Sequence, residues 1–260
     1  MKKLALASAL LATLATANVA QAYQYEVGAG VSRTDPDIGK ATNDINVEAT
    51  YYFESVDTKD YPLAEAAFMN RASNVSAAVT YGKDSPTTNT SVNLGGEYYL
   101  PNSDFYVGAG YSKDETKTSG VKDSIENYSA EVGMLPMPNL LVAVGVVDNS
   151  QGTDPTLRAK YVYKLGENDI NLEAKASFGD ADVFNVGADY YIDRTLSVGA
   201  AYTDNGNSDS FGIRARKFLT EDVSVQGTVD FGDNADVFGG LDQVLNGLIK
   251  IEAPQQTVSR

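Results

Sequence analysis

The sequence predicts an all-β fold, a closed antiparallel transmembrane β-barrel of about 14 strands, with 12 or 16 strands also possible. Three observations predict it. Short segments alternate apolar and polar residues with period two, aromatic residues gather at the ends of these segments, and the N-terminus resembles an export signal. Together they indicate a chain that crosses a bilayer with strands.

The N-terminus predicts a cleaved secretory signal peptide over residues 1–22. Lys2 and Lys3 are followed by an apolar stretch at 4–14 and by the small-x-small site Ala20-Gln21-Ala22. No later segment has the ~18 consecutive apolar residues of a membrane helix. An exported chain then stays in the periplasm or enters the cell outer membrane, and the strand pattern favours the outer membrane. We expect the barrel to occupy residues 23–251.

The period-two pattern is clearest at 223–231, where Val, Val, Gly, Val and Phe alternate with Ser, Gln, Thr and Asp. Successive side chains of a strand point to opposite faces, so such a segment has one apolar and one polar face. The predicted strands are 23–32, 43–53, 73–82, 89–100, 104–113, 124–134, 140–148, 156–164, 169–178, 182–192, 195–203, 208–218 and 222–231, with a fourteenth from about Ala235. Segments rich in Pro, Asn, Gly and Asp separate them, as in turns.

Aromatic residues fall at both ends of these strands. Strands that run away from the N-terminal side end near residues such as Tyr81 and Phe178, and returning strands end in Tyr51-Tyr52-Phe53, Tyr98-Tyr99 or Tyr190-Tyr191. Two aromatic girdles around an apolar band are typical of a barrel in lipid. A soluble β-sandwich, the main alternative, also alternates, but it has no reason to place rings so regularly at strand ends. Hydrocarbon also requires a closed sheet, because an open edge would leave backbone groups without partners.

The C-terminal region departs from this pattern. The apolar residues of 239–251 have helical spacing, so the last strand, from about 235, is uncertain. Residues 252–260 form a polar C-terminal tail without the terminal aromatic residue that bacterial barrels usually carry. Either the last strand is irregular and followed by a tail, or the natural ending has been altered.

Composition excludes several functions. Cys, His and Trp are absent and the formal net charge is −15, so the chain can form neither a disulfide, nor a His-dependent triad, nor a His- or Cys-ligated zinc site. So acidic a chain repels phosphate backbones, and no nucleic-acid partner is expected. We expect no enzyme activity, cofactor or metal. Gly108-Ala109-Gly110 resembles a fragment of a phosphate loop, but it lies within a strand, where small residues ease packing.

Residues 61–75, Tyr-Pro-Leu-Ala-Glu-Ala-Ala-Phe-Met-Asn-Arg-Ala-Ser-Asn-Val, resemble a stretch of the outer-membrane porins of Gram-negative gamma-proteobacteria. There too it follows an aromatic strand end. The resemblance implies an outer-membrane barrel with a diffusion role and carries over no catalytic residue. Residues 63–70 read as a short helix with Pro62 near its first turn. This helix either constricts the inner mouth of the pore or packs as a surface helix on the rim, and the second interpretation is favoured.

If the apolar face contacts lipid, the polar face lines the lumen. On this face the first six predicted strands contribute only acidic residues, and all of the basic residues come from later strands. The candidate pore-lining residues are Glu48, Glu97, Glu131, Arg158, Lys160, Glu173, Lys175, Arg214 and Arg216. An acidic arc opposite a basic wall would set up a transverse field across the channel. The equally weighted alternative is that these side chains form ion pairs that hold the barrel in shape.

The resulting prediction is a porin, a passive diffusion channel for small hydrophilic solutes and ions. The alternative is a structural or adhesive outer-membrane barrel with a lumen blocked by side chains. The expected partners are outer-membrane lipid and lipopolysaccharide, small hydrophilic solutes and the barrel-insertion machinery. The sequence leaves solute selectivity and oligomeric state open.

Overall fold

A computed structural model of the chain describes residues 22–37, 41–84, 86–149, 152–179, 182–233 and 235–246. All of the expected signal peptide except Ala22 lies outside the described residues, and so does the expected polar tail, 252–260. No helix in the described ranges has the length and hydropathy to cross a bilayer.

Long β-strands make up nearly all of the described chain. They are β1 (Ala22–Pro36), β2 (Thr42–Asp57), β3 (Asn74–Asp84), β4 (Thr87–Tyr99), β5 (Phe105–Thr118), β6 (Val121–Met137), β7 (Leu140–Asn149), β8 (Gly152–Leu165), β9 (Asn168–Ser177), β10 (Val183–Asp193), β11 (Leu196–Asp204), β12 (Asp209–Thr220), β13 (Val223–Gly232) and β14 (Ala235–Asn246). Two short helical turns, η1 (Leu63–Glu65) and α2 (Ala66–Met69), lie between β2 and β3.

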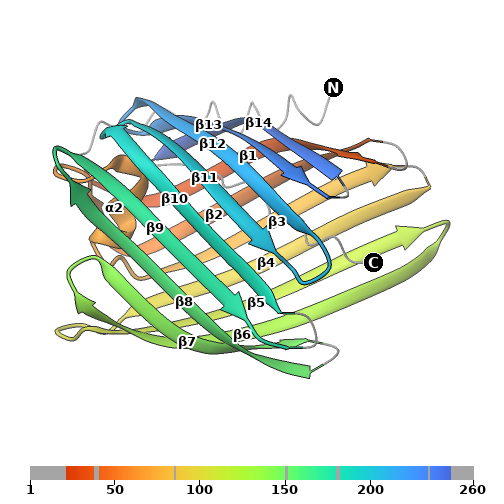
Figure 1. Ribbon diagram of the computed structural model, residues 1–260, viewed down its shortest axis with the longest axis horizontal. Helices are drawn as coiled ribbons and strands as arrows, with labels where there is room; N and C mark the ends of the chain where they lie inside the picture. The colour runs from red at the N-terminus through yellow and green to blue at the C-terminus, as the bar shows by residue number, and fades with distance from the viewer. Residues whose placement is uncertain are drawn as a thin grey trace.

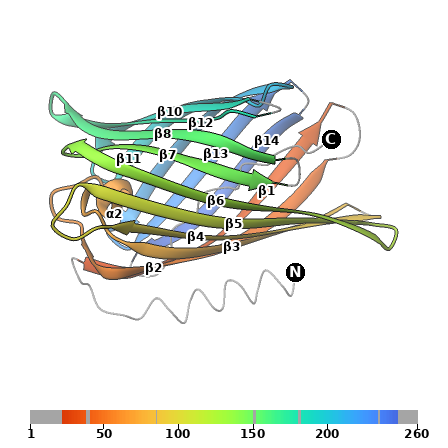
Figure 2. The same ribbon diagram turned by 90° about the horizontal axis from the view of Figure 1, so that it is seen from below.

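Each strand pairs antiparallel with its neighbours in sequence, and β14 pairs with both β13 and β1, so the strand order forms a closed barrel. Figures 1 and 2 show the tilted strands curving round into a barrel. The predicted all-β antiparallel class is confirmed. Turns lie where Pro, Asn and Gly predict them: Asn102, Asn139 and Gly166 have positive φ values, which Asn and Gly tolerate best.

The last strand differs from the helical spacing of its sequence. Residues 239–246 are the last eight residues of β14, in which Val244 pairs with Ser224 of β13 and with Gly28 of β1. The reason is tertiary: without β14, the facing edges of β1 and β13 would have unpaired backbone groups. Strand pairing on both sides therefore outweighs the local spacing of apolar residues.

The two faces of the sheet differ as period two predicts. Large apolar side chains are exposed on the outer face, among them Val132 at 59% and Val144 at 55%. The residues next to them in sequence, Glu131 and Gly145, belong to the inner face of the sheet. An apolar outside around a polar inside is the reverse of a soluble barrel.

The aromatic doublets correct one expectation. Of each neighbouring pair, one ring faces outward and the other inward: Tyr51 and Tyr98 are exposed, whereas Tyr52 and Tyr99 are buried. Alternation requires this, because adjacent residues of a strand cannot share a face. Tyr52, Tyr99 and Tyr191, one ring of each neighbouring pair, therefore form an internal collar instead of part of the outer girdle. Figure 1 places α2 at the same end of the barrel as this collar.

Candidate functional site

The segment between β2 and β3 folds into one mouth of the barrel, and we call it the insert (residues 58–73). Pro62 precedes its first turn, and Asn70 caps α2 by donating to the Ala66 carbonyl at 2.7 Å. Leu63 and Ala66 are almost completely buried. The insert packs on two apolar clusters of the barrel's inner wall, one with Tyr23, Tyr52 and Val56, the other with Tyr99, Tyr106, Leu135, Leu141 and Ala143.

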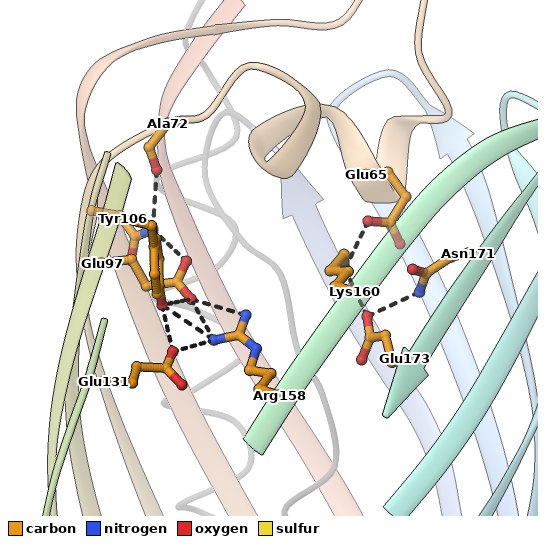
Figure 3. Close-up of polar contacts among 10 residues, drawn as sticks. Glu65, Ala72, Glu97, Tyr106, Glu131, Arg158, Lys160, Asn171 and Glu173 are labelled. Carbon is orange, nitrogen blue, oxygen red and sulfur yellow. Dashed lines mark hydrogen bonds and ion pairs between the residues drawn. The ribbon is translucent and has the colours of Figure 1, made fainter. Parts of the chain in front are cut away.

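Glu65 attaches the insert to the far wall. Its carboxylate, on a residue that is 5% exposed, pairs with the Lys160 ammonium of β8 at 2.8 Å and accepts a hydrogen bond from the Tyr191 hydroxyl of β10 at 2.5 Å. Lys160 also pairs with Glu173 of β9 at 2.7 Å and lies over the Phe68 ring of the insert. Figure 3 shows Lys160 between the two carboxylates.

The turn between β10 and β11 holds the insert from outside the mouth. The Leu63 backbone N–H donates to the Arg194 carbonyl at 2.9 Å, and the Arg194 guanidinium donates to the carbonyls of Tyr61, at 3.1 Å, and Thr58. The favoured interpretation, a surface helix on the rim, is therefore wrong. A carboxylate inside the barrel and partners across it draw the segment into the mouth, because a buried Glu needs a compensating cation.

A second cluster joins β4, β5, β6 and β8 on the inner wall. Arg158 contacts Glu131 at 2.6 Å and Glu97 at 3.2 Å. The Tyr106 hydroxyl donates toward both carboxylates, at 2.7 Å to Glu131 and 3.0 Å to Glu97. One guanidinium and one phenol thus bind two carboxylates that would otherwise repel each other (Figure 3).

Glycine makes room for this cluster. Gly108 lies between Glu97 and Glu131 in the strand register. A Cβ there would lie 2.8 Å from the Tyr106 hydroxyl and 2.9 Å from Glu131 Cγ. The interpretation of Gly108-Ala109-Gly110 as packing residues agrees with this geometry, because the side chains of neighbouring strands fill the space above Gly108.

The remaining basic side chains of the inner face lie on β9 and β12. Arg214 forms a two-pronged contact with Asp189 of β10, at 2.6 and 2.7 Å, and Arg216 donates to Gln226 of β13 at 2.8 Å. Lys175 is exposed and pairs in register with Arg158 and Asn185.

All nine residues that the sequence nominated as pore-lining lie on the inner face. The structure brings five of them together in two groups, Glu97, Glu131 and Arg158, and Lys160 with Glu173. Arg158 contacts the acidic arc directly instead of facing it across the channel. This arrangement favours ion pairs that hold the barrel in shape over a transverse field.

A hydrophilic cavity of about 660 Å³ occupies the space between the insert and the opposite mouth. Ala64 and Glu65 of the insert form its floor, and Thr34, Asn205 and Asp233 lie at its outer end. Its wall comes from β1–β4 and β8–β13, with Val237 of β14. The side that carries Arg158 and Tyr106 is filled instead by the paired cluster and the apolar residues beneath it.

The sequence did not single out three residues of the site, Glu65, Tyr106 and Tyr191. Tyr191 has a detectable signal, because it lies two residues from the polar Asp189 and so shares its face. Tyr106 lies two residues from Gly108 and shares its face, but nothing in the sequence marks that glycine as part of a site. Glu65 has no such signal. It lies outside the strands, and its partner Tyr191 is 126 residues away.

Comparison with known proteins identifies the family. A family model described as "Putative general bacterial porin" matches residues 1–159. The chain belongs to this porin family. The resemblance that residues 61–75 suggested is thereby confirmed.

The crystal structure of the outer membrane protein Omp33 of Acinetobacter baumannii is similar to this porin. The two are 31% identical with a TM-score of 0.70, over 87% of this chain and 99% of that one. The KdgM porin in complex with disordered oligogalacturonate (11% identity, TM-score 0.46, 84% of this chain and 98% of that one) is more distant. The low-pH structure of Pseudomonas putida OprB is also more distant (11% identity, TM-score 0.45, 86% of this chain and 92% of that one). No curated protein sequence matches this porin.

Proposed function

We propose that this porin is a passive diffusion channel for small hydrophilic solutes and ions, formed by a closed transmembrane barrel of fourteen strands. One observation carries the proposal: a sheet with exposed Val, Leu and aromatic side chains outside surrounds a polar cavity of about 660 Å³. An apolar outside suits lipid, and a polar inside suits water.

The width of the barrel supports a conducting lumen. Eight strands leave an interior that side chains fill, whereas about 16–18 strands leave an open aqueous channel. Fourteen strands lie between these cases, and here the paired cluster around Arg158 fills part of the interior while the cavity occupies the rest. Glu48, Glu97, Glu131, Arg158, Lys160, Glu173, Lys175, Arg214 and Arg216 line the proposed pathway.

The location follows from the same proposal. The chain is exported with cleavage after Ala22, is inserted by the barrel-insertion machinery, and contacts lipid and lipopolysaccharide of the cell outer membrane. The insert then lies at the periplasmic mouth, because β1 starts on that side and β2 returns to it. Solutes then enter through the mouth opposite the insert and pass the edge of the insert.

Liposome swelling tests the proposal. Purified folded protein in liposomes is placed in isosmotic solutions of small sugars, and the swelling rate is followed by light scattering. Diffusion through the lumen gives faster swelling for smaller solutes. Swelling no faster than that of empty liposomes, with a protein that is fully heat-modifiable on gels, contradicts a diffusion channel.

The second candidate, a structural barrel with a blocked lumen, is favoured by the insert. Its buried Glu65 contacts and apolar packing close much of one mouth. The same swelling assay on a Glu65→Ala protein separates the candidates. A channel narrowed by the insert swells in both forms and faster in the variant, whereas a structural barrel has no basal swelling.

A further inference from the structure

The charged groups of the cavity are unevenly distributed along its axis. In the half near the insert, acids and bases neutralise each other: Lys160 pairs with Glu65 and Glu173, and Arg214 pairs with Asp189. All three basic residues that line the cavity, these two and Arg216, belong to this half or to its boundary. The inner half is therefore close to electrically balanced.

The outer half is acidic. Glu48, Asp209, Asp230 and Asp233 line it, and no basic residue is among the described residues that line this half. The exposed Lys175, on the inner face of β9, is not part of the cavity lining, and counting it with the lining still leaves more acidic than basic groups. In total the described lining has seven carboxylates and three basic groups. The sequence of β14 contains no Lys or Arg, so that strand adds no basic group whichever way its side chains point. The excess negative charge does not depend on which ion pairs form.

At the floor of the cavity, the buried side chain of Asn171 also favours a solute that donates hydrogen bonds. Asn171, 1% exposed, donates from its amide nitrogen to Glu173 at 2.9 Å and to Asp189 at 3.2 Å. Its carbonyl oxygen has no hydrogen-bond partner within the described chain. A buried acceptor without a partner favours a donor such as water or an ammonium group.

We propose that the acidic outer half of the cavity, which we call the vestibule, makes the porin selective for cations. Its preferred solutes are monovalent cations and small solutes with an ammonium group. Carboxylates that line a cavity with low-dielectric protein walls raise the local concentration of cations and exclude anions. The inference rests on the proposed diffusion function, which it makes more specific.

The test is the reversal potential of the purified porin in planar bilayers under a KCl gradient. We expect a K⁺ to Cl⁻ permeability ratio on the order of 5 or more, since charged clefts concentrate counter-ions at least severalfold. Conducting channels with a ratio of 1 or less overturn the selectivity and leave the diffusion function intact. Absence of conductance from a folded protein overturns both.

Charge-neutralising variants test whether the carboxylates of the outer half cause the cation selectivity. In Asp230→Asn/Asp233→Asn the ratio falls by about twofold or more, because half of the outer carboxylates lose their charge. Asp123→Asn, at the exposed tip of the β5–β6 hairpin, is the matched control and keeps the wild-type ratio. An unchanged ratio in the double variant, or an equal fall in the control, overturns the assignment to the vestibule. Replacing K⁺ with methylammonium keeps the sign of the potential, and a reversed sign contradicts the solute class.

Discussion

The two halves of this barrel use the same strands in different ways. In the insert half, the inner face carries rings and paired charges, and Glu65, Tyr191 and Lys160 are all nearly buried. In the outer half, the inner face is hydrophilic and open, and ion pairs such as Lys122–Glu115 lie in solvent on the β5–β6 hairpin. The comparison indicates that the burial of an ion pair, and not the number of charges, decides how much the pair contributes to stability. One half sets the width of the pathway, and the other sets its charge.

Loss of Arg158 tests the insert half most severely. Arg158→Ala leaves Glu97 and Glu131 next to each other without a cation, and removing one partner of a partly buried network costs about 4 kcal/mol of the free energy of unfolding. Urea titration of the folded protein in lipid vesicles measures the loss. Arg158→Lys restores the charge but not the branched contact, so it recovers part of the stability. Equal losses in both variants contradict a role for the charge.

Loss of Glu65 tests the attachment of the insert. Glu65→Ala removes the acceptor of the Tyr191 hydroxyl and one of two carboxylates on Lys160, which weakens the docked insert by about 3 kcal/mol. Single-channel recording should give a higher mean conductance. Glu173→Gln is the matched control: it removes the other carboxylate on Lys160 and leaves the insert docked, so the conductance stays near wild type. A rise in both variants points to lumen charge instead of the insert.

The Arg194 guanidinium holds the insert by hydrogen bonds to uncharged backbone carbonyls. Arg194→Ala removes the donors to the carbonyls of Tyr61 and Thr58, and a hydrogen bond from a charged donor contributes about 1.5 kcal/mol. We expect proteolysis of the insert in detergent-solubilised protein to become severalfold faster. Arg33→Ala, which removes an exposed contact to Asp35 at the other mouth, leaves the cleavage rate unchanged. Cleavage as slow as in the wild type shows that the Glu65 contacts and the apolar packing keep the insert docked without the Arg194 side chain.

The smallest effect on stability is expected for an exposed ion pair of the outer half. Lys122→Ala breaks an exposed ion pair with Glu115, and such pairs contribute about 0.5 kcal/mol or less. The midpoint of urea unfolding should therefore stay within error of the wild type. A shift as large as that of Arg158→Ala removes the contrast between the halves.

The strands and their faces were predictable from particular residues. Alternation at 223–231 predicts β13 (Val223–Gly232), and Pro138-Asn139 predicts the turn after β6. The same alternation put Glu97, Glu131 and Arg158 on one face. It also contains the information that Tyr52 and Tyr99 point inward, because each follows an outward ring by one residue.

The pairing of charges was not predictable in this way. Arg158 reaches Glu97, 61 residues earlier, because β8 lies close to β4 across the curved wall and because Gly108 leaves room for the contact. Register and curvature decide this, and neither is encoded locally. The helical spacing failed over 239–246 for the same reason, since the pairing needs of β1 and β13 determine the conformation of β14, while residues 247–251 lie outside the described chain.

By itself the sequence determined where the strands run, which side of each is apolar, and that residues 63–70 form a short helix. Those features depend on neighbours within a few positions. Only the tertiary structure decided that the helix enters the mouth of the barrel, and that the basic groups of the cavity lining lie near it while four of the seven lining carboxylates lie toward the other mouth. A buried carboxylate such as Glu65 must find a cation, and only the closed arrangement of strands brings Lys160 within reach.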